Sequence, residues 1–359
     1  MPGRSTDRQI SLDGLRGIAV AMVFFYHHNW LQIGWTGVDL FFVISGYLIT
    51  TILRRTRGDA HFWKEFWVKR ATRILPPLLL LLLAVAVTDR ERIVWLPALL
   101  LSLGDLAAYM RPHFESTRPL WSLAVEEHFY LLWPFAVRNL QRRTLLAILV
   151  TIIVGEPLLR GFAVSHVPDW QLVYFLTPFR LDGISLGSLL ALLAEVPMVM
   201  DLLGRWSLVF FALSLGSFGA LRLLLGEAFT RGNAPFYNAA VYTIVALAAF
   251  FLVVYLIQFP RSILARALSL RPLVFLGAIS YGLYLYQDFV LVAVIRFGHI
   301  SWRSLPLCTG PITLLAAWAS FTFYEKPLIL WGKRKAQSFR PLHAAAVSPP
   351  TCHEPVRSD

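Results

Sequence analysis

The sequence predicts an all-α fold, a polytopic transmembrane helical bundle of about ten spans with both termini in the cytoplasm. Of its 359 residues, 57% are hydrophobic and 15% are charged, whereas soluble domains average about 45–50% and about 25%. The apolar residues recur in blocks of roughly 15–25, the length at which a helix crosses a hydrocarbon layer of about 30 Å. The net charge of +12 gathers in short segments between these blocks, which is typical of membrane topology and not of a nucleic-acid partner.

Eleven apolar blocks follow one another along the chain. They lie at Gly14–Leu31, Val38–Leu53, Ile74–Val87, Ile93–Ala108, Trp121–Val137, Leu145–Leu159, Leu172–Leu193, Trp206–Leu225, Tyr237–Phe259, Leu273–Ile295 and Leu305–Leu330. The first block follows Arg4 and Arg8 but contains no small-residue cleavage signal, so we expect a retained helix and not a signal peptide. The two cysteines, Cys308 and Cys352, indicate neither a disulfide scaffold nor a thiolate metal site.

The positions of the basic residues select one threading of these blocks. The most basic loop, between the second and third blocks, carries Arg54, Arg55, Arg57, Lys64, Lys69, Arg70 and Arg73. Short basic loops are cytoplasmic, so the N-terminus is predicted to lie inside as well. If all eleven blocks crossed, the clusters at 138–143 and 261–271 would lie outside. Both return to the cytoplasm if Ile93–Ala108 is re-entrant, interfacial or packed beside the third helix, which leaves ten spans.

The domain organisation follows from this threading. Residues 1–335 form the predicted transmembrane domain. Residues 336–359 are rich in Pro, Ser and Ala with scattered charge, which is typical of a disordered tail. We therefore expect a multi-pass membrane protein without a large soluble domain.

Ionisable side chains inside the predicted spans are the first candidates for function, because each is unfavourable by several kcal/mol unless it is paired or hydrated. They are Arg16, His27, His28, Asp39, Glu126, Glu127, His128, Arg180, Asp182 and Asp288. Arg180 and Asp182 are expected to form a structural or gating ion pair. Tyr281, Tyr284 and Tyr286 with Asp288 line a polar cavity in one interpretation and belong to interfacial belts or the packed core in the other.

Arg16 and His27 are predicted to share one helical face. They are eleven residues apart, and at 100° per residue this separation falls about 20° from a whole number of turns. His28 is turned about 120° away from Arg16, so His27 is the better candidate for a shared site. The alternative is that Arg16 snorkels or pairs with Asp13, while His27 only caps a buried hydrogen bond.

Glu126 is predicted to lie at a membrane depth within one helical turn of His27. A carboxylate near an imidazole fixes its tautomer and raises its basicity, which is the arrangement used in general-base catalysis. In the alternative interpretation, Glu126 is a buried residue that pairs with Arg180 for packing.

Arg70 and Arg73 place two guanidinium groups three residues apart on one helical face at the cytoplasmic side. Guanidinium groups bind phosphate well, although a plain positive-inside anchor also explains them. A phosphate-bearing acyl carrier held there would extend a thioester roughly 17 Å inward, toward His27.

Several motifs, in order along the chain, carry a resemblance to a known family. They are LDGLRG at 12–17, His27, GVDLFFVISG at 37–46 with Asp39, RATRILP at 70–76, LWSLAVEEHFY at 120–130, RLDG at 180–183, ISYGLY at 279–284 and YEKP at 324–327. Together they resemble the integral-membrane acyltransferase-3 family over about Gln9 to Leu330. The position after the two glutamates is usually glutamine in that family and is His128 here, which affects the local hydrogen bonds.

The resemblance implies a bacterial inner-membrane enzyme that transfers an acetyl or other short acyl group from cytoplasmic acyl-CoA, foremost acetyl-CoA. The acceptor would be a hydroxyl of a sugar, an envelope glycan, a lipid or a macrolide. Arg16, Arg70 and Arg73 would bind the donor, with Arg16, His27 and Glu126 as the catalytic set and no metal. His27 would act as a base or carry the acyl group itself. A second transfer step would need a separate protein.

Two other classes of function remain open on the sequence. A transporter or flippase would use the same charges as a proton relay and a substrate path, although no inverted repeat is visible. If the protein were a membrane scaffold or sensor, the alignment of Arg16, His27 and Glu126 would be accidental. Labelled acetyl-CoA separates the enzyme from both, because only the enzyme yields a covalent product.

Overall fold

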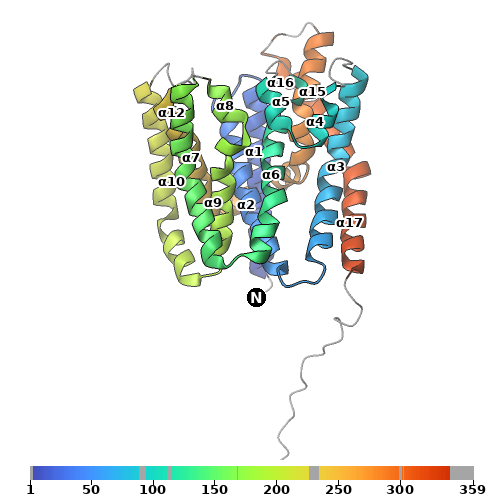
Figure 1. Ribbon diagram of the computed structural model, residues 1–359. Helices are drawn as coiled ribbons and strands as arrows, with labels where there is room; N and C mark the ends of the chain where they lie inside the picture. Colours follow the sequence, from blue (N-terminus) through green and yellow to red (C-terminus); the bar gives the residue numbers. More distant parts are fainter. Residues whose placement is uncertain are drawn as a thin grey trace, which may run out of the picture.

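A computed structural model of the chain describes residues 3–88, 94–110, 115–167, 169–225, 234–298, 301 and 303–339. Within these ranges every regular element is helical, which confirms the all-α fold class. The elongated helices pack side by side into one bundle (Figure 1). The start of α1 (Gly3–His27) and the end of α17 (Lys326–Ser338) lie at the same end of this bundle.

The remaining helices follow in chain order. They are η1 (Gly34–Thr36), α2 (Gly37–Thr56), α3 (Phe62–Thr88), α4 (Leu96–Leu100), α5 (Gly104–Met110), η3 (Glu115–Thr117), α6 (Leu120–Asn139), α7 (Arg142–His166), α8 (Trp170–Phe175), η4 (Thr177–Phe179), α9 (Leu181–Leu193), α10 (Pro197–Leu225), α12 (Pro235–Gln258), α13 (Ile263–Leu268), α14 (Arg271–Ala278), α15 (Ser280–Phe297), α16 (Leu305–Ala319) and η5 (Ser320–Glu325).

Seven helical segments in the described ranges are long and apolar enough to cross a membrane, and there are eight if the bent pair α14 and α15 is one span. The seven are 10–27, 34–56, 62–88, 142–166, 197–225, 235–258 and 305–338. The protein is thus a multi-pass membrane protein. The predicted ten spans would further require α6, which carries two glutamates, and the thirteen-residue α9. The number of ten stays a prediction.

The fourth apolar block forms no long helix in its described part. Residues 96–110 contain only the short helices α4 and α5, while Ile93 lies outside the described residues. Leu99 and Ala107 pack in one cluster with Leu78, Leu81 and Leu82 of α3. Packing beside the third helix is one of the three arrangements that the charge pattern leaves open for this block.

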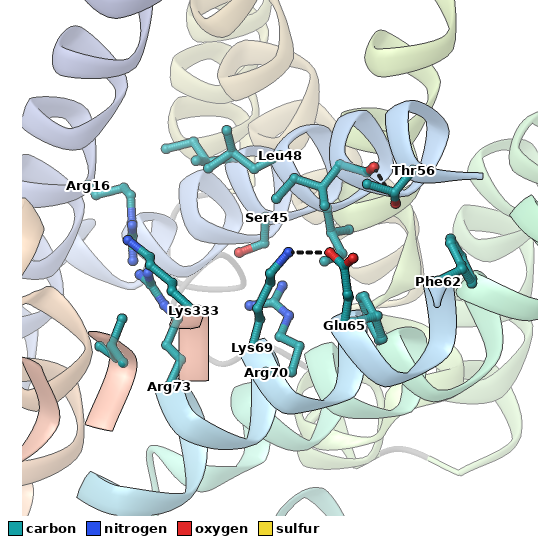
Figure 2. A pocket seen from close by; sticks show the side chains of 15 residues that line it. Arg16, Ser45, Leu48, Thr56, Phe62, Glu65, Lys69, Arg70, Arg73 and Lys333 are labelled. Atoms are coloured by element: carbon teal, nitrogen blue, oxygen red, sulfur yellow. Dashed lines mark hydrogen bonds and ion pairs between the residues drawn. The ribbon is translucent and has the colours of Figure 1, made fainter. Parts of the chain in front are cut away.

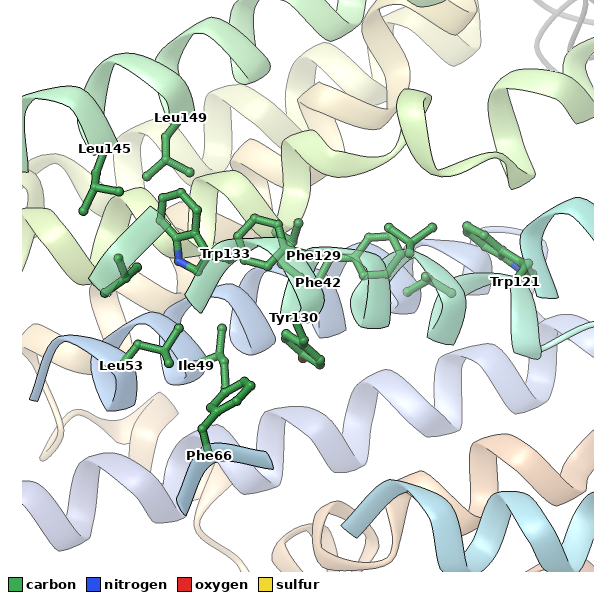
Figure 3. Packing of buried hydrophobic residues seen from close by; sticks show 14 of the residues in the cluster. Phe42, Ile49, Leu53, Phe66, Trp121, Phe129, Tyr130, Trp133, Leu145 and Leu149 are labelled. Carbon is green, nitrogen blue, oxygen red and sulfur yellow. The ribbon is translucent and has the colours of Figure 1, made fainter. Parts of the chain in front are cut away.

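Close packing fixes α2 against α9 and α6. A Cβ at Gly46 would collide with the Ile184 carbonyl oxygen, and one at Gly187 with the Val43 carbonyl oxygen, so the two backbones touch only because these residues are glycines. The largest core cluster joins α2, α3, α6 and α7 through Phe42, Ile49, Leu53, Phe66, Trp121, Phe129, Trp133, Leu145 and Leu149 (Figure 3). It holds the Glu126 turn of α6 opposite the Ser45 turn of α2.

The end of the chain lies partly outside the described residues. Helix α17 continues to Ser338, three residues beyond the predicted domain boundary at 335. The rest of the predicted tail, from residue 340, lies outside the described residues, so its disorder stays a prediction.

Candidate active site

A cavity of about 300 Å³ is lined by five basic side chains from three helices. Arg16 comes from α1, Lys69, Arg70 and Arg73 come from α3, and Lys333 comes from α17 (Figure 2). The single acid in its lining, Glu65, accepts a hydrogen bond of 2.8 Å from Lys69. We call this space the cationic cavity. Its excess of positive charge suits a ligand with several phosphates.

Arg70 and Arg73 both line the cationic cavity, which confirms that they share one face of α3. The guanidinium of Arg70 lies over the ring of Tyr130, 4.0 Å from its centroid. Its buried Nε has no hydrogen-bond partner among the described residues. Arg16 faces the same cavity and lies 3.7 Å from Asp13, so the alternative pairing with Asp13 is also present. All three arginines line this one cavity, an arrangement that a plain positive-inside anchor does not require.

A second, narrower cavity of about 70 Å³ shares Arg16 and Ser45 with the cationic cavity. We call it the inner cavity. Its other polar lining residues are Ser122, Glu126, Ser280, Tyr281 and Tyr284. The shared residues place the two cavities next to each other. A ligand anchored in the first cavity could therefore extend into the second, where these polar groups stand among Val38, Phe41, Phe42 and Leu123.

Glu126 is held at the junction of the two cavities. Its carboxylate accepts hydrogen bonds of 2.9 Å from the Ser45 hydroxyl and 2.8 Å from the Tyr130 hydroxyl. Because Tyr130 also stacks under Arg70, a continuous set of contacts joins Arg70 to Ser45. The alternative pairing of Glu126 with Arg180 is wrong, since Arg180 binds a different carboxylate.

Polar residues follow one another along a single face of α15, from the inner cavity to the end of α1. Tyr281, Tyr284 and Asp288 follow the spacing of three and four residues that places side chains on one face. The Tyr281 hydroxyl donates to the Ile74 carbonyl at 3.2 Å, and the hydroxyls of Tyr284 and Ser122 are 2.6 Å apart. Tyr281 and Tyr284 thus line the inner cavity, as one of the two interpretations predicts. Tyr286 and Asp288 do not line it, and Tyr286 is buried with its hydroxyl 2.9 Å from that of Ser320, as the packed-core interpretation predicts.

His27 ends α1 beside this face of α15. Its Nδ1 lies 3.0 Å from the Val23 carbonyl oxygen and 3.6 Å from Asp288 Oδ1. The side-chain amide nitrogen of Gln287 also lies 3.4 Å from this Nδ1. In the tautomer that carries its proton on Nδ1, which the two oxygens favour, Nε2 is left as an acceptor. The side chain of His27 is 15% exposed. The contacts of His27 with the described residues all involve Nδ1 and leave Nε2 unoccupied.

His28 has a structural environment. It is buried, with Nε2 at 2.6 Å from the Thr309 hydroxyl and Nδ1 at 2.7 Å from the Phe24 carbonyl oxygen. Both ring nitrogens are thus occupied, which supports the choice of His27 over His28.

The expected contact between Glu126 and His27 does not form. Among the described residues no hydrogen bond or ion pair joins them, and His27 lines neither of the two cavities. Glu126 faces α2, while the end of α1 faces α15, so Asp288 takes the place expected for Glu126. Asp288 stands one turn of α15 beyond Tyr284. The intramembrane charge of Asp288 was the sequence signal for a polar role, but its partner was missed.

The prediction that Arg180 and Asp182 form an ion pair is wrong. Arg180 donates to Asp39 at 3.0 Å, and Asp182 accepts from Arg160 at 2.9 Å. Arg180 precedes α9 and Asp182 lies in its first turn, and residues two apart in such a segment do not face each other. The guanidinium of Arg180 is surrounded by aromatic rings, with Tyr242 nearest at 4.2 Å.

Arg160 and Glu156 on α7 were overlooked in the sequence. Both are buried, and Arg160 contacts Glu156, Asp182 and Thr243. Glu156 lies inside the apolar block Leu145–Leu159 and Arg160 directly follows that block, so their spacing of four residues was the signal for a buried pair. We call Asp39, Glu156, Arg160, Arg180 and Asp182 the buried ion cluster. It lines neither of the two cavities described above.

Two further polar residues of α6, Glu127 and His128, line neither cavity. Glu127 accepts a hydrogen bond from the Ser102 hydroxyl, and His128 Nδ1 lies 2.8 Å from the Thr177 hydroxyl. Thr177 also donates to Asp105 at 2.6 Å. His128 thus joins α6 to the segment before α9. Among the described residues, no group of three or more His, Cys, Asp or Glu side chains is placed to hold a metal ion.

Comparison with known proteins adds the family context. Residues 9–324 match the acyltransferase domain of the acyltransferase-3 type. The chain is 30% identical over 350 residues to the peptidoglycan O-acetyltransferase OatA of Listeria monocytogenes, an alignment that covers 89% of this chain and 55% of that protein. It is 31% identical over 353 residues to the O-acetyltransferase OatA of Staphylococcus aureus, covering 88% and 56%.

The alignments cover most of this chain but only part of each relative. The chain spans about half the length of the curated relatives it matches, as the coverage of 55% and 56% shows. No solved structure matches the chain.

Proposed function

The chain belongs to the acyltransferase-3 family, and we propose that it transfers an acetyl or other short acyl group from cytoplasmic acyl-CoA to the hydroxyl group of an acceptor. The observation that carries the proposal is the pair of adjoining cavities. One is strongly cationic, the other is smaller and is lined by a carboxylate and several hydroxyl groups among apolar side chains, and they meet at Arg16 and Ser45. This is the shape that a donor with a phosphate-rich head and a long arm requires.

In this proposal, Arg16, Arg70 and Arg73 bind the phosphates of coenzyme A, and Lys69 and Lys333 add to the positive potential. Guanidinium groups form strong, directional hydrogen bonds to phosphate oxygens. The acyl donor is proposed to be acetyl-CoA, because the relatives are named O-acetyltransferases. No metal is part of the proposal.

His27 is proposed to be the catalytic base. The acceptor hydroxyl loses its proton to Nε2 as its oxygen bonds to the thioester carbon, and the carbon–sulfur bond then breaks to release the coenzyme A thiolate. Asp288 near Nδ1 would stabilise the imidazolium that forms. In a covalent variant, Nε2 itself takes the acyl group before passing it to the acceptor.

Glu126 is proposed to act from the inner cavity and not through His27. Its contacts with Ser45 and Tyr130 keep the junction between the cavities polar and hold Tyr130 under Arg70. A carboxylate at this point would order the route along which the arm of the donor enters.

The acceptor is proposed to be a hydroxyl of an envelope glycan, because one relative is named for peptidoglycan. We place the enzyme in the bacterial cytoplasmic membrane with ten spans and both termini inside. With this orientation the basic side chains of the cationic cavity face the compartment that supplies acyl-CoA.

The test is acetyl transfer by the purified protein in lipid nanodiscs, supplied with acetyl-CoA labelled in its acetyl group and with soluble glycans that bear free hydroxyls. We expect an O-acetylated product whose label is released by mild base. A transporter would yield no covalent product. Absence of product with every acceptor, from protein that binds coenzyme A, would contradict the proposed activity.

A further inference from the structure

The span formed by α14 and α15 is broken inside the bundle. Helix α14 ends at Ala278, α15 begins at Ser280, and the two axes differ by 71°. The first N–H groups of a helix have no partner within that helix, and they carry a partial positive charge from the helix dipole. In transporters, such half-helix ends in the membrane interior bind polar ligand groups. A helix end alone is insufficient evidence for a site.

The Ser280 hydroxyl supplies an independent observation. Ser280 is 1% exposed, lines the inner cavity, and its Oγ has no hydrogen-bond partner among the described residues. A buried hydroxyl without a partner is unfavourable, so such groups usually serve a ligand or a structural contact. Here the hydroxyl and the N-terminal end of α15 are at the same place on the cavity wall. Both offer hydrogen-bond donors.

Ser280 lies between the phosphate site and His27. It is eight residues from Asp288 along α15, which is about 12 Å at 1.5 Å per residue. Asp288 contacts His27, whereas the inner cavity at Ser280 adjoins the cationic cavity through Arg16 and Ser45. A donor bound by its phosphates and reacting at His27 would therefore pass Ser280 with the middle of its arm.

We propose that Ser280 and the N-terminal end of α15 bind an amide carbonyl oxygen in the arm of coenzyme A. The inference rests on the proposed function, since it assumes this donor. The arm contains two amide groups between the diphosphate and the sulfur. An amide carbonyl taken from water into a narrow cavity is unfavourable unless a donor replaces its hydrogen bonds. The broken helix supplies these donors at the place where the arm needs them.

The experiment compares two ligands on two proteins. The dissociation constants of coenzyme A and of its phosphoadenosine diphosphate part are measured by calorimetry on the full chain in nanodiscs. The smaller ligand keeps every phosphate and lacks the arm. For Ser280→Ala we expect coenzyme A to bind about fivefold more weakly, as for the loss of one neutral hydrogen bond. The smaller ligand should bind with unchanged affinity.

Ser185→Ala is the matched control. Ser185 is also buried, and its hydroxyl also lacks a partner among the described residues, but it lies on α9 and does not line the inner cavity. It should leave both affinities unchanged. Equal weakening of both ligands by Ser280→Ala would indicate a general structural change and would overturn the inference. Unchanged binding of coenzyme A would overturn it as well.

These outcomes are separable from the failure of the proposed function, because binding needs no turnover. Wild-type protein that binds coenzyme A but acetylates nothing would contradict the activity and leave the arm site testable. Protein that acetylates an acceptor with Ser280→Ala at wild-type affinity would contradict only the arm site. Wild-type protein that does not bind coenzyme A would overturn both.

Discussion

Two regions of this bundle hold intramembrane charge in opposite ways. In the buried ion cluster, Arg160 and Arg180 each bind a carboxylate at about hydrogen-bond distance, and the cluster lines neither cavity. In the cationic cavity, five basic side chains face one shared space that contains a single acid. A charge within a span can thus be matched by other charges of the protein or can face a cavity, and the proposed donor site uses charges of the second kind.

The largest expected effect is the loss of turnover when His27 is replaced. We expect His27→Ala to lower the turnover number by about 100- to 10,000-fold, the usual contribution of a general base. Affinity for coenzyme A should remain, because His27 lines neither cavity. Turnover is measured with labelled acetyl-CoA. Near-normal turnover in this variant would remove His27 from the mechanism.

Removing the charge of Arg160 from the buried ion cluster should lower the stability of the protein. Arg160→Met leaves Glu156 and Asp182 without their cation, and breaking a buried pair lowers the free energy of unfolding by about 3–5 kcal/mol. Thermal unfolding in detergent measures the loss, with His27→Ala as the control. The protein that stays folded should bind coenzyme A normally. A stable Arg160→Met variant that had lost donor affinity would reverse the comparison between the two regions.

Removing the charge of Arg70 or Arg73 should weaken binding of the acyl donor. Either Arg70→Gln or Arg73→Gln should raise the KM for acetyl-CoA about 10- to 100-fold, as for loss of a charged hydrogen bond. The melting temperature should change little. Arg54→Gln is the matched control, because Arg54 is paired with Glu195 outside the cationic cavity. Similar KM values for all three variants would argue against a phosphate site.

The smallest expected effect concerns Asp288. If it stabilises the imidazolium of His27 as a positioning residue, Asp288→Asn should lower the turnover number by about tenfold with little change in KM. Asp288→Glu should recover part of that loss, because it restores the negative charge. A purely structural role would predict that both variants lose stability and that neither recovers turnover.

Sequence reasoning found the helical faces but not their partners. The spacing of Arg70 and Arg73 placed both on one face, and the structure turns that face to a cavity. The choice of His27 over His28 likewise followed from helical angles alone. Such local periodicity is a property of one helix, so it needs no knowledge of the neighbouring helices.

Contacts between distant helices were the part that the sequence did not supply. His27 meets Asp288, 261 residues away, and Asp39 meets Arg180, 141 residues away. These pairs depend on which helix faces which, and that is set by packing such as the glycine contact of α2 with α9. Ser280 illustrates the same limit, because its free hydroxyl becomes visible only where the helix breaks.

The central claim is that the two adjoining cavities hold the acyl donor, with its phosphates on the arginines and its sulfur toward His27. A cryo-electron microscopy structure with a non-hydrolysable acetyl-CoA analogue tests it most directly. The account predicts phosphate density within hydrogen-bonding distance of Arg70 and Arg73, and the arm in the inner cavity beside Ser280. Density for the analogue elsewhere on the protein, with both cavities occupied by lipid or water, would contradict it.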